Sequence, residues 1–171
     1  MLERLSISER QTRALGRALG RLCRAGDVVA VLGPLGAGKT RFVQGLAAGL
    51  GVERIRDVVS PTFTLIDEHP GRLTLWHADL YRVDREEDLE QIGLREILPG
   101  DGVTAVEWLD RFPALFPRDY LEVRLAIGKG TRRRLTARAH GRRALALLDA
   151  WMGRPARGHA PRHRPSPSRR A

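Results

Sequence analysis

Apolar residues near the N-terminus recur at the spacing of an amphipathic helix. They follow two overlapping patterns, Ser6–Glu9 and Ser8–Gln11, in which a serine precedes Glu or Gln by three residues. This capping-box spacing marks the start of a helix, because the side chains satisfy backbone N–H groups that have no partner within it. We expect this helix to run to about Arg24, before Gly26, which is typical of a helix end.

The next apolar run is short and rich in valine, which favours a buried strand over Val28–Leu32. A glycine-rich loop, Gly33–Lys39, separates it from a second helical pattern, Thr40–Leu50, which ends at Gly51. A strand, a glycine-rich loop and a helix are therefore expected in direct succession.

Two later regions have the pattern of β-hairpins. The first pairs Thr64–His69 with Arg72–His77 across a Pro-Gly turn, and the second pairs Tyr120–Ile127 with Arg132–Ala139 across Gly-Lys-Gly. Between them, Val103–Val106 is another short apolar run and a candidate buried strand. The pattern predicts an α/β domain whose sheet mixes parallel strands with two antiparallel hairpins.

Three further segments complete the predicted domain. Asp84–Gln91 is acidic and helical in pattern, Leu94–Leu98 is expected to continue it, and Arg142–Met152 is expected to form the last helix. Residues 153–171 are dominated by Arg, Pro, His, Ser, Gly and Ala, a composition typical of disorder. We expect one domain over residues 1–152 and a disordered Arg/Pro-rich tail.

The net charge of +10 is unevenly distributed. Residues 1–128 contain 17 basic and 19 acidic residues, whereas residues 129–171 contain 13 basic residues and one acidic residue. Two interpretations of the basic tail stay open: an inert extension, and an electrostatic contact with RNA. The single cysteine, Cys23, excludes an intramolecular disulfide, and no apolar run approaches the roughly 20 residues of a membrane span. With no signal-peptide pattern either, a cytoplasmic protein without a membrane partner is expected.

The glycine-rich loop matches the pattern G-x-x-x-x-G-K-[ST] of phosphate-binding loops over Gly33–Thr40. Glycines allow positive φ, so that successive backbone N–H groups point at an anion beside the positive end of a helix. We expect the Lys39 ammonium to reach the β- and γ-phosphates of a nucleotide and the Thr40 hydroxyl to bind Mg²⁺. The residues expected to contact the nucleotide are Gly33, Leu35, Gly36, Ala37, Gly38, Lys39 and Thr40.

A loop of this kind requires an acidic partner for Mg²⁺ at the end of a neighbouring strand. Glu107 directly follows Val103–Val106, and Asp79 lies at the end of the first hairpin's second strand. We favour Glu107 as the metal ligand because its strand is the clearer buried run, and Asp79 as a residue that positions water. For each, the alternative is a solvated carboxylate at a strand end.

Another candidate lies in the stretch SPTFTL, residues 60–65. Pro61 restricts Ser60 to an extended conformation and so presents Thr62 on a constrained loop. A hydroxyl in this position could sense the γ-phosphate, as switch segments of GTPases do. Taken alone, however, Ser-Pro-Thr is an ordinary turn signal.

Four motifs occur in order: GPLGAGKT (33–40), SPTFTL (60–65), HADLYR (77–82) and AVEW (105–108). Together they resemble the bacterial TsaE (YjeE) family, the P-loop ATPases of tRNA threonylcarbamoyladenosine synthesis, over about residues 8–135. The resemblance implies a P-loop NTPase-like three-layer fold and ATP binding, with Mg²⁺ held by Thr40 and Glu107. It also implies that Asp79 and Thr62 serve catalysis with Lys39, and that an arginine of 132–134, assigned as Arg132, approaches the nucleotide.

The resemblance further implies partner proteins, TsaD and TsaB, which transfer threonylcarbamoyl to N6 of the adenosine flanking the anticodon. The ATPase would have low intrinsic activity, support or regulate that complex, and meet tRNA through it or through the basic tail. Two other functions stay open. One is a small-molecule kinase with Arg132–Arg134 as a basic lid, and the other is a non-enzymatic RNA-binding module that uses the tail.

Overall fold

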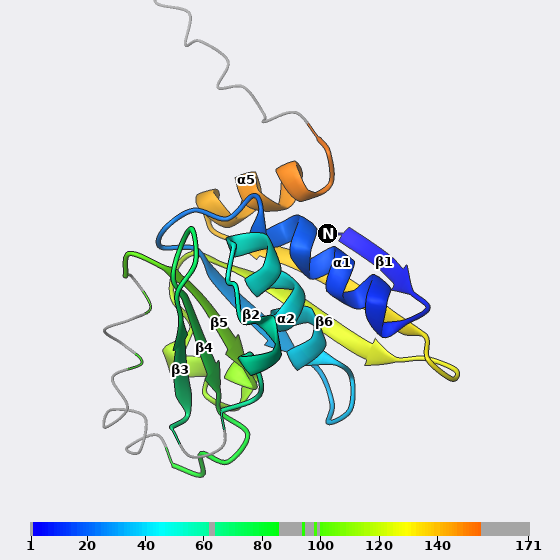
Figure 1. The fold of residues 1–171 in the computed structure, drawn as a ribbon, viewed down its shortest axis with the longest axis horizontal. Helices are drawn as coiled ribbons and strands as arrows, with labels where there is room; N and C mark the ends of the chain where they lie inside the picture. Colours follow the sequence, from blue (N-terminus) through cyan, green and yellow to red (C-terminus); the bar gives the residue numbers. More distant parts are fainter. Residues whose placement is uncertain (1, 62–63, 86–93, 95–97, 99, 155–171) are drawn as a thin grey trace, which may run out of the picture.

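The computed structural model describes residues 2–61, 64–85, 94, 98 and 100–154. Its strands form one mixed sheet with the spatial order β1-β7-β6-β2-β5-β4-β3 (Figure 1). The strands are β1 (Leu2–Ser6), β2 (Val28–Leu32), β3 (Ile66–His69), β4 (Leu75–Asp79), β5 (Val103–Glu107), β6 (Tyr120–Ile127) and β7 (Arg133–His140).

The strand directions confirm the predicted mixed α/β fold. Strand β2 runs parallel to both of its neighbours, β5 and β6, and β4 runs parallel to β5. The two hairpins, β3–β4 and β6–β7, are antiparallel, and β1 adds an antiparallel edge strand to β7. The carboxyl ends of β2, β4 and β5 therefore meet at one edge of the sheet, which is where α/β sheets bind ligands.

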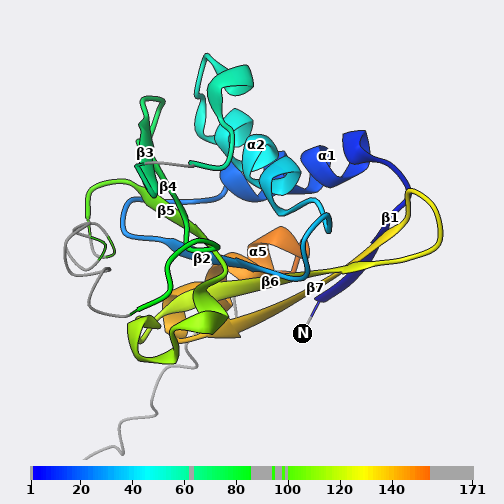
Figure 2. The same ribbon diagram turned by 90° about the horizontal axis from the view of Figure 1, so that it is seen from below.

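The sheet separates two apolar cores. Helices α1 (Glu9–Gly20), α2 (Lys39–Leu50) and α5 (Arg142–Trp151) contribute side chains to one core, together with Val29 and Val31 of β2. Ala30 faces the other core, which includes Leu109 and Leu115 from two short 3-10 helices. Figure 2 shows α1 and α2 on one side of the sheet and these 3-10 segments on the opposite side. Strand β2 is thus buried on both faces, as its continuous apolar run predicts.

Helices α1 and α2 approach each other at four glycines, Gly16 and Gly20 on α1 and Gly45 and Gly49 on α2. A Cβ on Gly45 would lie 2.1 Å from the carbonyl oxygen of Arg13, and the other three would meet backbone oxygens at 2.2–2.4 Å. Backbone therefore packs directly on backbone at this crossing. Because α2 directly follows the glycine-rich loop, the packing of α2 on α1 also constrains the position of the end of that loop.

The N-terminal segment differs from expectation. Residues Leu2–Ser6 form β1, so the capping box predicted at Ser6–Glu9 is wrong, and the one at Ser8–Gln11 is right. The Gln11 N–H donates to the Ser8 hydroxyl at 3.2 Å, and helix α1 ends at Gly20 rather than near Arg24. The strand is held by its antiparallel register with β7. That pairing joins residues far apart in the sequence, so no local pattern indicates it.

The hairpins are shifted from their predicted bounds. The second strand of the first hairpin is Leu75–Asp79, not Arg72–His77, because its residues pair with the full length of β5 on the other side. Tyr120–Ile127 is confirmed, and its partner strand is displaced by one residue to Arg133–His140. The predicted helix over Asp84–Gln91 and the predicted disorder of residues 153–171 lie largely outside the described residues.

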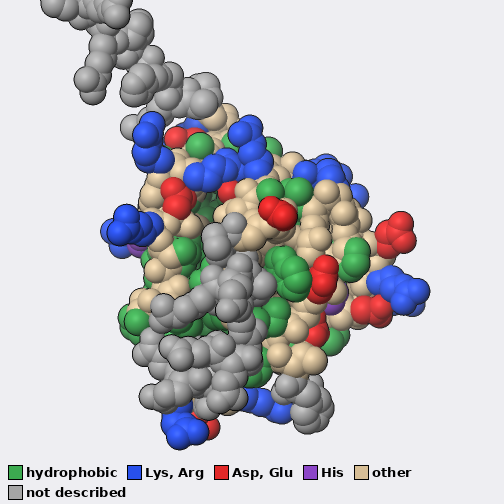
Figure 3. Space-filling model, turned by 90° about the vertical axis from the view of Figure 1, so that its left-hand side faces the viewer, with side chains coloured by type: hydrophobic (Ala, Val, Ile, Leu, Met, Phe, Trp, Pro, Cys, Tyr) green, Lys and Arg blue, Asp and Glu red, His purple; other side chains and the backbone are tan. Residues whose placement is uncertain are grey.

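The described surface at the β3 edge of the sheet carries charges of both signs. Figure 3, which looks onto the left-hand side of Figure 1, shows Lys and Arg side chains interspersed with Asp and Glu. This agrees with the near balance of charge over residues 1–128. No helix in the described part of the chain is long and apolar enough to cross a membrane.

The glycine contact between α1 and α2 predicts that replacing one of these glycines by alanine destabilises the protein. An alanine normally favours a helix over glycine by about 1 kcal/mol, but Gly45→Ala should lower the free energy of unfolding by about 1–3 kcal/mol, because its methyl group meets the Arg13 carbonyl. Chemical denaturation measures this change. Arg10→Ala, on the exposed surface of α1, is the control and should shift stability by less than about 0.5 kcal/mol. A stabilised Gly45→Ala protein would contradict the packing argument.

Candidate nucleotide-binding site

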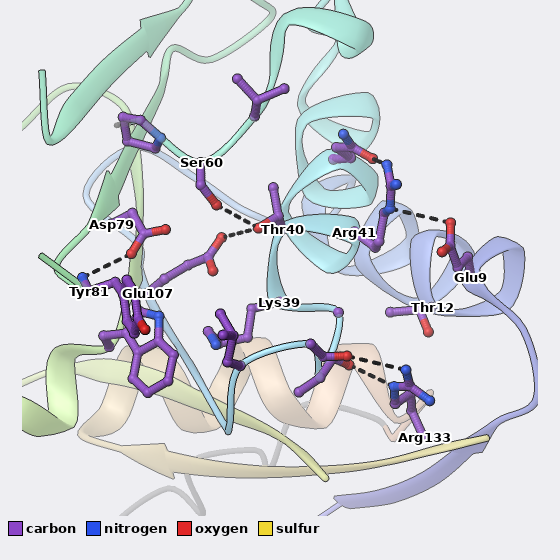
Figure 4. A pocket seen from close by; sticks show the side chains of 18 of the residues that line it. Glu9, Thr12, Lys39, Thr40, Arg41, Ser60, Asp79, Tyr81, Glu107 and Arg133 are labelled. Atoms are coloured by element: carbon purple, nitrogen blue, oxygen red, sulfur yellow. Dashed lines mark hydrogen bonds and ion pairs between the residues drawn. The ribbon is translucent and has the colours of Figure 1, made fainter. Parts of the chain in front are cut away.

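A cavity of about 620 Å³ opens at the carboxyl edge of the sheet, beside the start of α2 (Figure 4). The glycine-rich loop forms one wall, and the ends of β4 and β5 form another. The cavity thus brings together most of the residues that the sequence singles out. Those lining it are Leu35, Gly36, Ala37, Gly38, Lys39, Thr40, Asp79 and Glu107.

The backbone of the loop adopts conformations that favour glycine. Gly36 has φ 74° and Gly38 has φ 94°, and α2 begins directly at Lys39 with no side chain capping its first turn. The first N–H groups of α2 therefore face the cavity region with the positive end of the helix dipole. Gly33, also expected to contact a nucleotide, is not among the lining residues. Its Cα instead approaches β6, where a Cβ would lie 2.2 Å from the Leu125 carbonyl oxygen.

The Lys39 ammonium is held inside the loop. Nζ donates to the carbonyl oxygens of Gly33 at 2.9 Å and Pro34 at 3.1 Å, and it lies 3.8 Å from the ring centroid of Trp108. Burial lowers the pKa of Lys39, and the nearby carboxylates, first that of Glu107, oppose this shift. The atoms in direct contact with the ammonium, two carbonyl oxygens and an aromatic ring, carry no formal negative charge.

The predicted metal-binding pair is in direct contact. Oγ1 of Thr40 donates to Oε1 of Glu107 at 3.0 Å, although the two residues are 67 positions apart. Oγ1 of Thr40 also lies 2.8 Å from Oγ of Ser60. Glu107 is only 2% exposed, so its carboxylate depends on protein donors such as the Thr40 hydroxyl for the hydrogen bonds that water would otherwise supply.

Asp79 lies beside this pair at the same edge. It is opposite Glu107 in the parallel register of β4 and β5, and its Oδ1 accepts a hydrogen bond from the Tyr81 N–H at 3.0 Å. The two carboxylates therefore sit on neighbouring strand ends, as the sequence analysis expects. Among the described residues, no group of three or more His, Cys, Asp or Glu side chains is arranged to hold a metal ion.

The arginine that reaches the loop is Arg133, whereas the sequence analysis assigned Arg132. Nε of Arg133 donates to the Ala37 carbonyl at 3.0 Å, and its Nη2 donates to the Gly36 carbonyl at 3.2 Å. Side chains alternate along β7, and Arg133 shares its face with the core residue Leu135. Arg132 precedes the strand, is exposed and does not line the cavity.

Thr62 lies outside the described residues, but the neighbouring Ser60 does contact the site through Thr40. The sequence analysis names Ser60 only as a residue restricted by Pro61. The hydroxyl group of Ser60, next to the predicted switch residue Thr62, is the signal that could have identified it as part of the site. The sequence analysis also missed the ion pair between Glu9 and Arg41 at 3.3 Å, which joins α1 to α2 at the cavity rim. No spacing pattern in the sequence links those two charges.

These features define an α/β fold of the P-loop type, with the loop between a buried parallel strand and a helix. A model of the family described as "Threonylcarbamoyl adenosine biosynthesis protein TsaE" matches residues 6–135. The match covers most of the chain, so the chain belongs to the TsaE family. The family is named for the biosynthesis of threonylcarbamoyladenosine in tRNA.

Individual relatives agree with this assignment. The tRNA threonylcarbamoyladenosine biosynthesis protein TsaE of Treponema pallidum is 41% identical over 132 residues, which cover 77% of this chain and 96% of that protein. The TsaE protein of Bacillus subtilis is 38% identical over 145 residues, covering 84% and 89%. The crystal structure of Bacillus subtilis YdiB superposes with a TM-score of 0.74 at 30% identity, covering 89% of this chain and 94% of that one.

The contacts of Arg133 predict a difference between two adjacent arginines. Arg133→Ala should weaken ATP binding, because the Gly36 and Ala37 carbonyls lose the guanidinium that holds this part of the loop in place. Two charge-assisted hydrogen bonds are lost, so a drop of about tenfold or more is expected. Arg132→Ala removes the same charge from an exposed position and should leave affinity near that of the wild type. Calorimetric titration with ATP measures the affinity of both variants. A larger loss of affinity in Arg132→Ala would support Arg132, the arginine assigned from the sequence.

Proposed function

We propose that this chain binds ATP with Mg²⁺ and hydrolyses it slowly, in support or regulation of a tRNA-modifying complex that contains TsaD and TsaB. The observation that carries the ATPase proposal is the contact between Thr40, at the start of α2, and Glu107, at the end of β5. This places a hydroxyl and a buried carboxylate directly beside the glycine-rich loop. Family membership supports the tRNA pathway.

A nucleotide triphosphate suits the loop on chemical grounds. The open N–H groups of the first turn of α2 and the Lys39 ammonium supply positive charge from two directions. The ammonium is a compact point charge with three donors, which can bind a phosphate oxygen. The cavity volume of about 620 Å³ is within the range of small-ligand sites.

The residues of the site also fit Mg²⁺. This ion prefers oxygen ligands and usually combines one or two protein side chains with water and substrate phosphates, so Thr40 and Glu107 suffice. Glu107 is 2% exposed, and a cation would compensate the cost of its buried negative charge. When bound, the ion would neutralise charge on the phosphates during hydrolysis.

Slow turnover by the isolated chain follows from what its own residues offer. Asp79 is the side chain that we propose orients water, but one of its oxygens already accepts from the Tyr81 backbone. The Arg133 guanidinium is engaged by loop carbonyls and does not serve as a free arginine finger. A partner that alters the position of either group would therefore accelerate hydrolysis, which is the basis for expecting regulation. The proposed location of such a complex is the cytoplasm.

The two carboxylates should respond differently to removal. Glu107→Ala is expected to reduce Mg²⁺-dependent ATP hydrolysis by about 100-fold or more while ATP binding without Mg²⁺ is retained, because only the metal site loses a ligand. Steady-state phosphate release and calorimetry measure these quantities. Glu122→Ala, on β6 outside the cavity, is the matched control. Full hydrolysis by Glu107→Ala, with loss in Asp79→Ala instead, would exchange the roles of the two residues.

Partner dependence is tested by pull-down of TsaD and TsaB with the full chain, with and without ATP. Capture should depend on ATP, and the complex should hydrolyse ATP faster than the chain alone. Lys39→Ala should lose both effects, because the loop loses its ammonium. Absence of binding and of any change in hydrolysis would contradict the proposed role. Phosphoryl transfer to a metabolite without any partner would instead indicate a small-molecule kinase.

A further inference from the structure

The Glu107 carboxylate receives a second hydrogen bond, from the ring of His77. Nε2 of His77 lies 3.1 Å from the same oxygen, Oε1, that accepts from the Thr40 hydroxyl. In the tautomer that carries its proton on Nε2, the ring donates this hydrogen bond to the carboxylate oxygen. Both hydrogen bonds go to the same carboxylate oxygen, Oε1, rather than one to each oxygen.

His77 is held rigidly. It lies in the middle of β4, opposite Ala105 of β5, and two residues further along β5 is Glu107 on the same face of the sheet. Its side chain is 0% exposed. Burying a histidine costs more free energy than burying an apolar residue of similar size, unless its polar atoms form hydrogen bonds. For His77, the contact with Glu107 supplies such a bond.

The ring of His77 meets the carboxylate through one nitrogen. Nδ1 of His77 is buried with no hydrogen-bond partner among the described residues. Nε2 is therefore the ring atom through which His77 acts on the site. A lysine or arginine at this position would pair with Glu107 and compete with a cation for it.

We propose that His77 is a positioning residue for the metal site: it fixes Oε1 of Glu107 so that Oε2 is available to Mg²⁺. The inference rests on the proposed function, since it concerns the same ion. Of the two donors to Oε1, Thr40 is itself an expected ligand of Mg²⁺. His77 is thus the donor that holds the carboxylate from outside the ligand set, and such partners tune metal affinity.

The chain contains a matched control for this role. His69 lies on the other strand of the same hairpin, is 9% exposed, and has its ring centroid 6.5 Å from that of His77. Its Nε2 has no hydrogen-bond partner among the described residues. Replacing His69 therefore removes a buried imidazole from this hairpin without touching Glu107.

The test is a titration of Mg²⁺ into the full chain with saturating ATP, followed by calorimetry, with ATP affinity in EDTA and the melting temperature measured for every variant. His77→Phe should raise the half-maximal Mg²⁺ concentration about 10- to 100-fold and leave ATP affinity in EDTA unchanged. His69→Phe should leave the half-maximal concentration near that of the wild type. His77→Gln, whose amide nitrogen comes closest to the place of Nε2, should bind Mg²⁺ more tightly than the shorter His77→Asn.

Equal half-maximal Mg²⁺ concentrations in His77→Phe and His69→Phe would overturn the role of His77. If His77→Phe does not fold, His77→Gln and His77→Asn provide the test. Equal half-maximal Mg²⁺ concentrations for these two variants would also overturn the role of His77. Failure of the wild-type chain to bind ATP at all would overturn the proposed function together with this inference. Normal ATP binding combined with equal Mg²⁺ responses would overturn the inference alone.

Discussion

The hydrogen bond between the Thr40 hydroxyl and the Glu107 carboxylate joins the first turn of α2 to the end of β5. The rest of the site is arranged around this contact, because it brings the buried Glu107 carboxylate beside the end of the glycine-rich loop. Ser60 and His77 each add one further contact, from the segment after α2 and from β4. A carboxylate that is 2% exposed is tolerated only because neighbouring donors replace water, so these contacts are needed for stability as well as for chemistry.

The position of that contact depends on how closely α2 approaches the rest of the molecule. Glycines on α1 and α2 allow the two backbones to touch, and apolar side chains of α2 join the core formed with β2 and β5. Arg133 of β7 donates to the carbonyl oxygens of two loop residues, Gly36 and Ala37. The loop is therefore held by a strand as well as by the helix that follows it. A preorganised loop of this kind does not pay the entropy of ordering when a ligand binds.

Membership of the TsaE family and the geometry of the cavity give complementary information. The family assignment places the chain in the tRNA threonylcarbamoyladenosine pathway, but it says nothing about how individual side chains act here. The proposed nucleotide-dependent switch would draw on residues of different elements: Thr40 from α2 and Glu107 from β5, with Ser60 of the segment after α2 in contact with Thr40. A ligand that draws on all three would couple their positions, which is the physical requirement for regulation by a partner.

The sequence by itself was sufficient for the elements whose signals are local. The buried strand Val28–Leu32, the glycine-rich loop and α2 follow from an apolar run and glycine spacing, and the mixed α/β class follows from the two hairpin patterns. The loop motif also indicates Lys39 and Thr40, and the end of the buried run Val103–Val106 indicates Glu107. Local patterns suffice here because backbone conformation and side-chain periodicity are properties of neighbouring residues.

Only the tertiary structure decided which distant groups meet. Strand β1 exists because Leu2–Ser6 pairs with β7, and Arg133 rather than Arg132 reaches the loop because side-chain alternation along β7 turns it toward the core. The bond from His77 to Glu107 likewise depends on the register of β4 against β5, in which a shift of one residue would turn His77 to the opposite face. Contacts between residues 30 to more than 100 positions apart are set by strand order and packing, and no local sequence pattern contains that information.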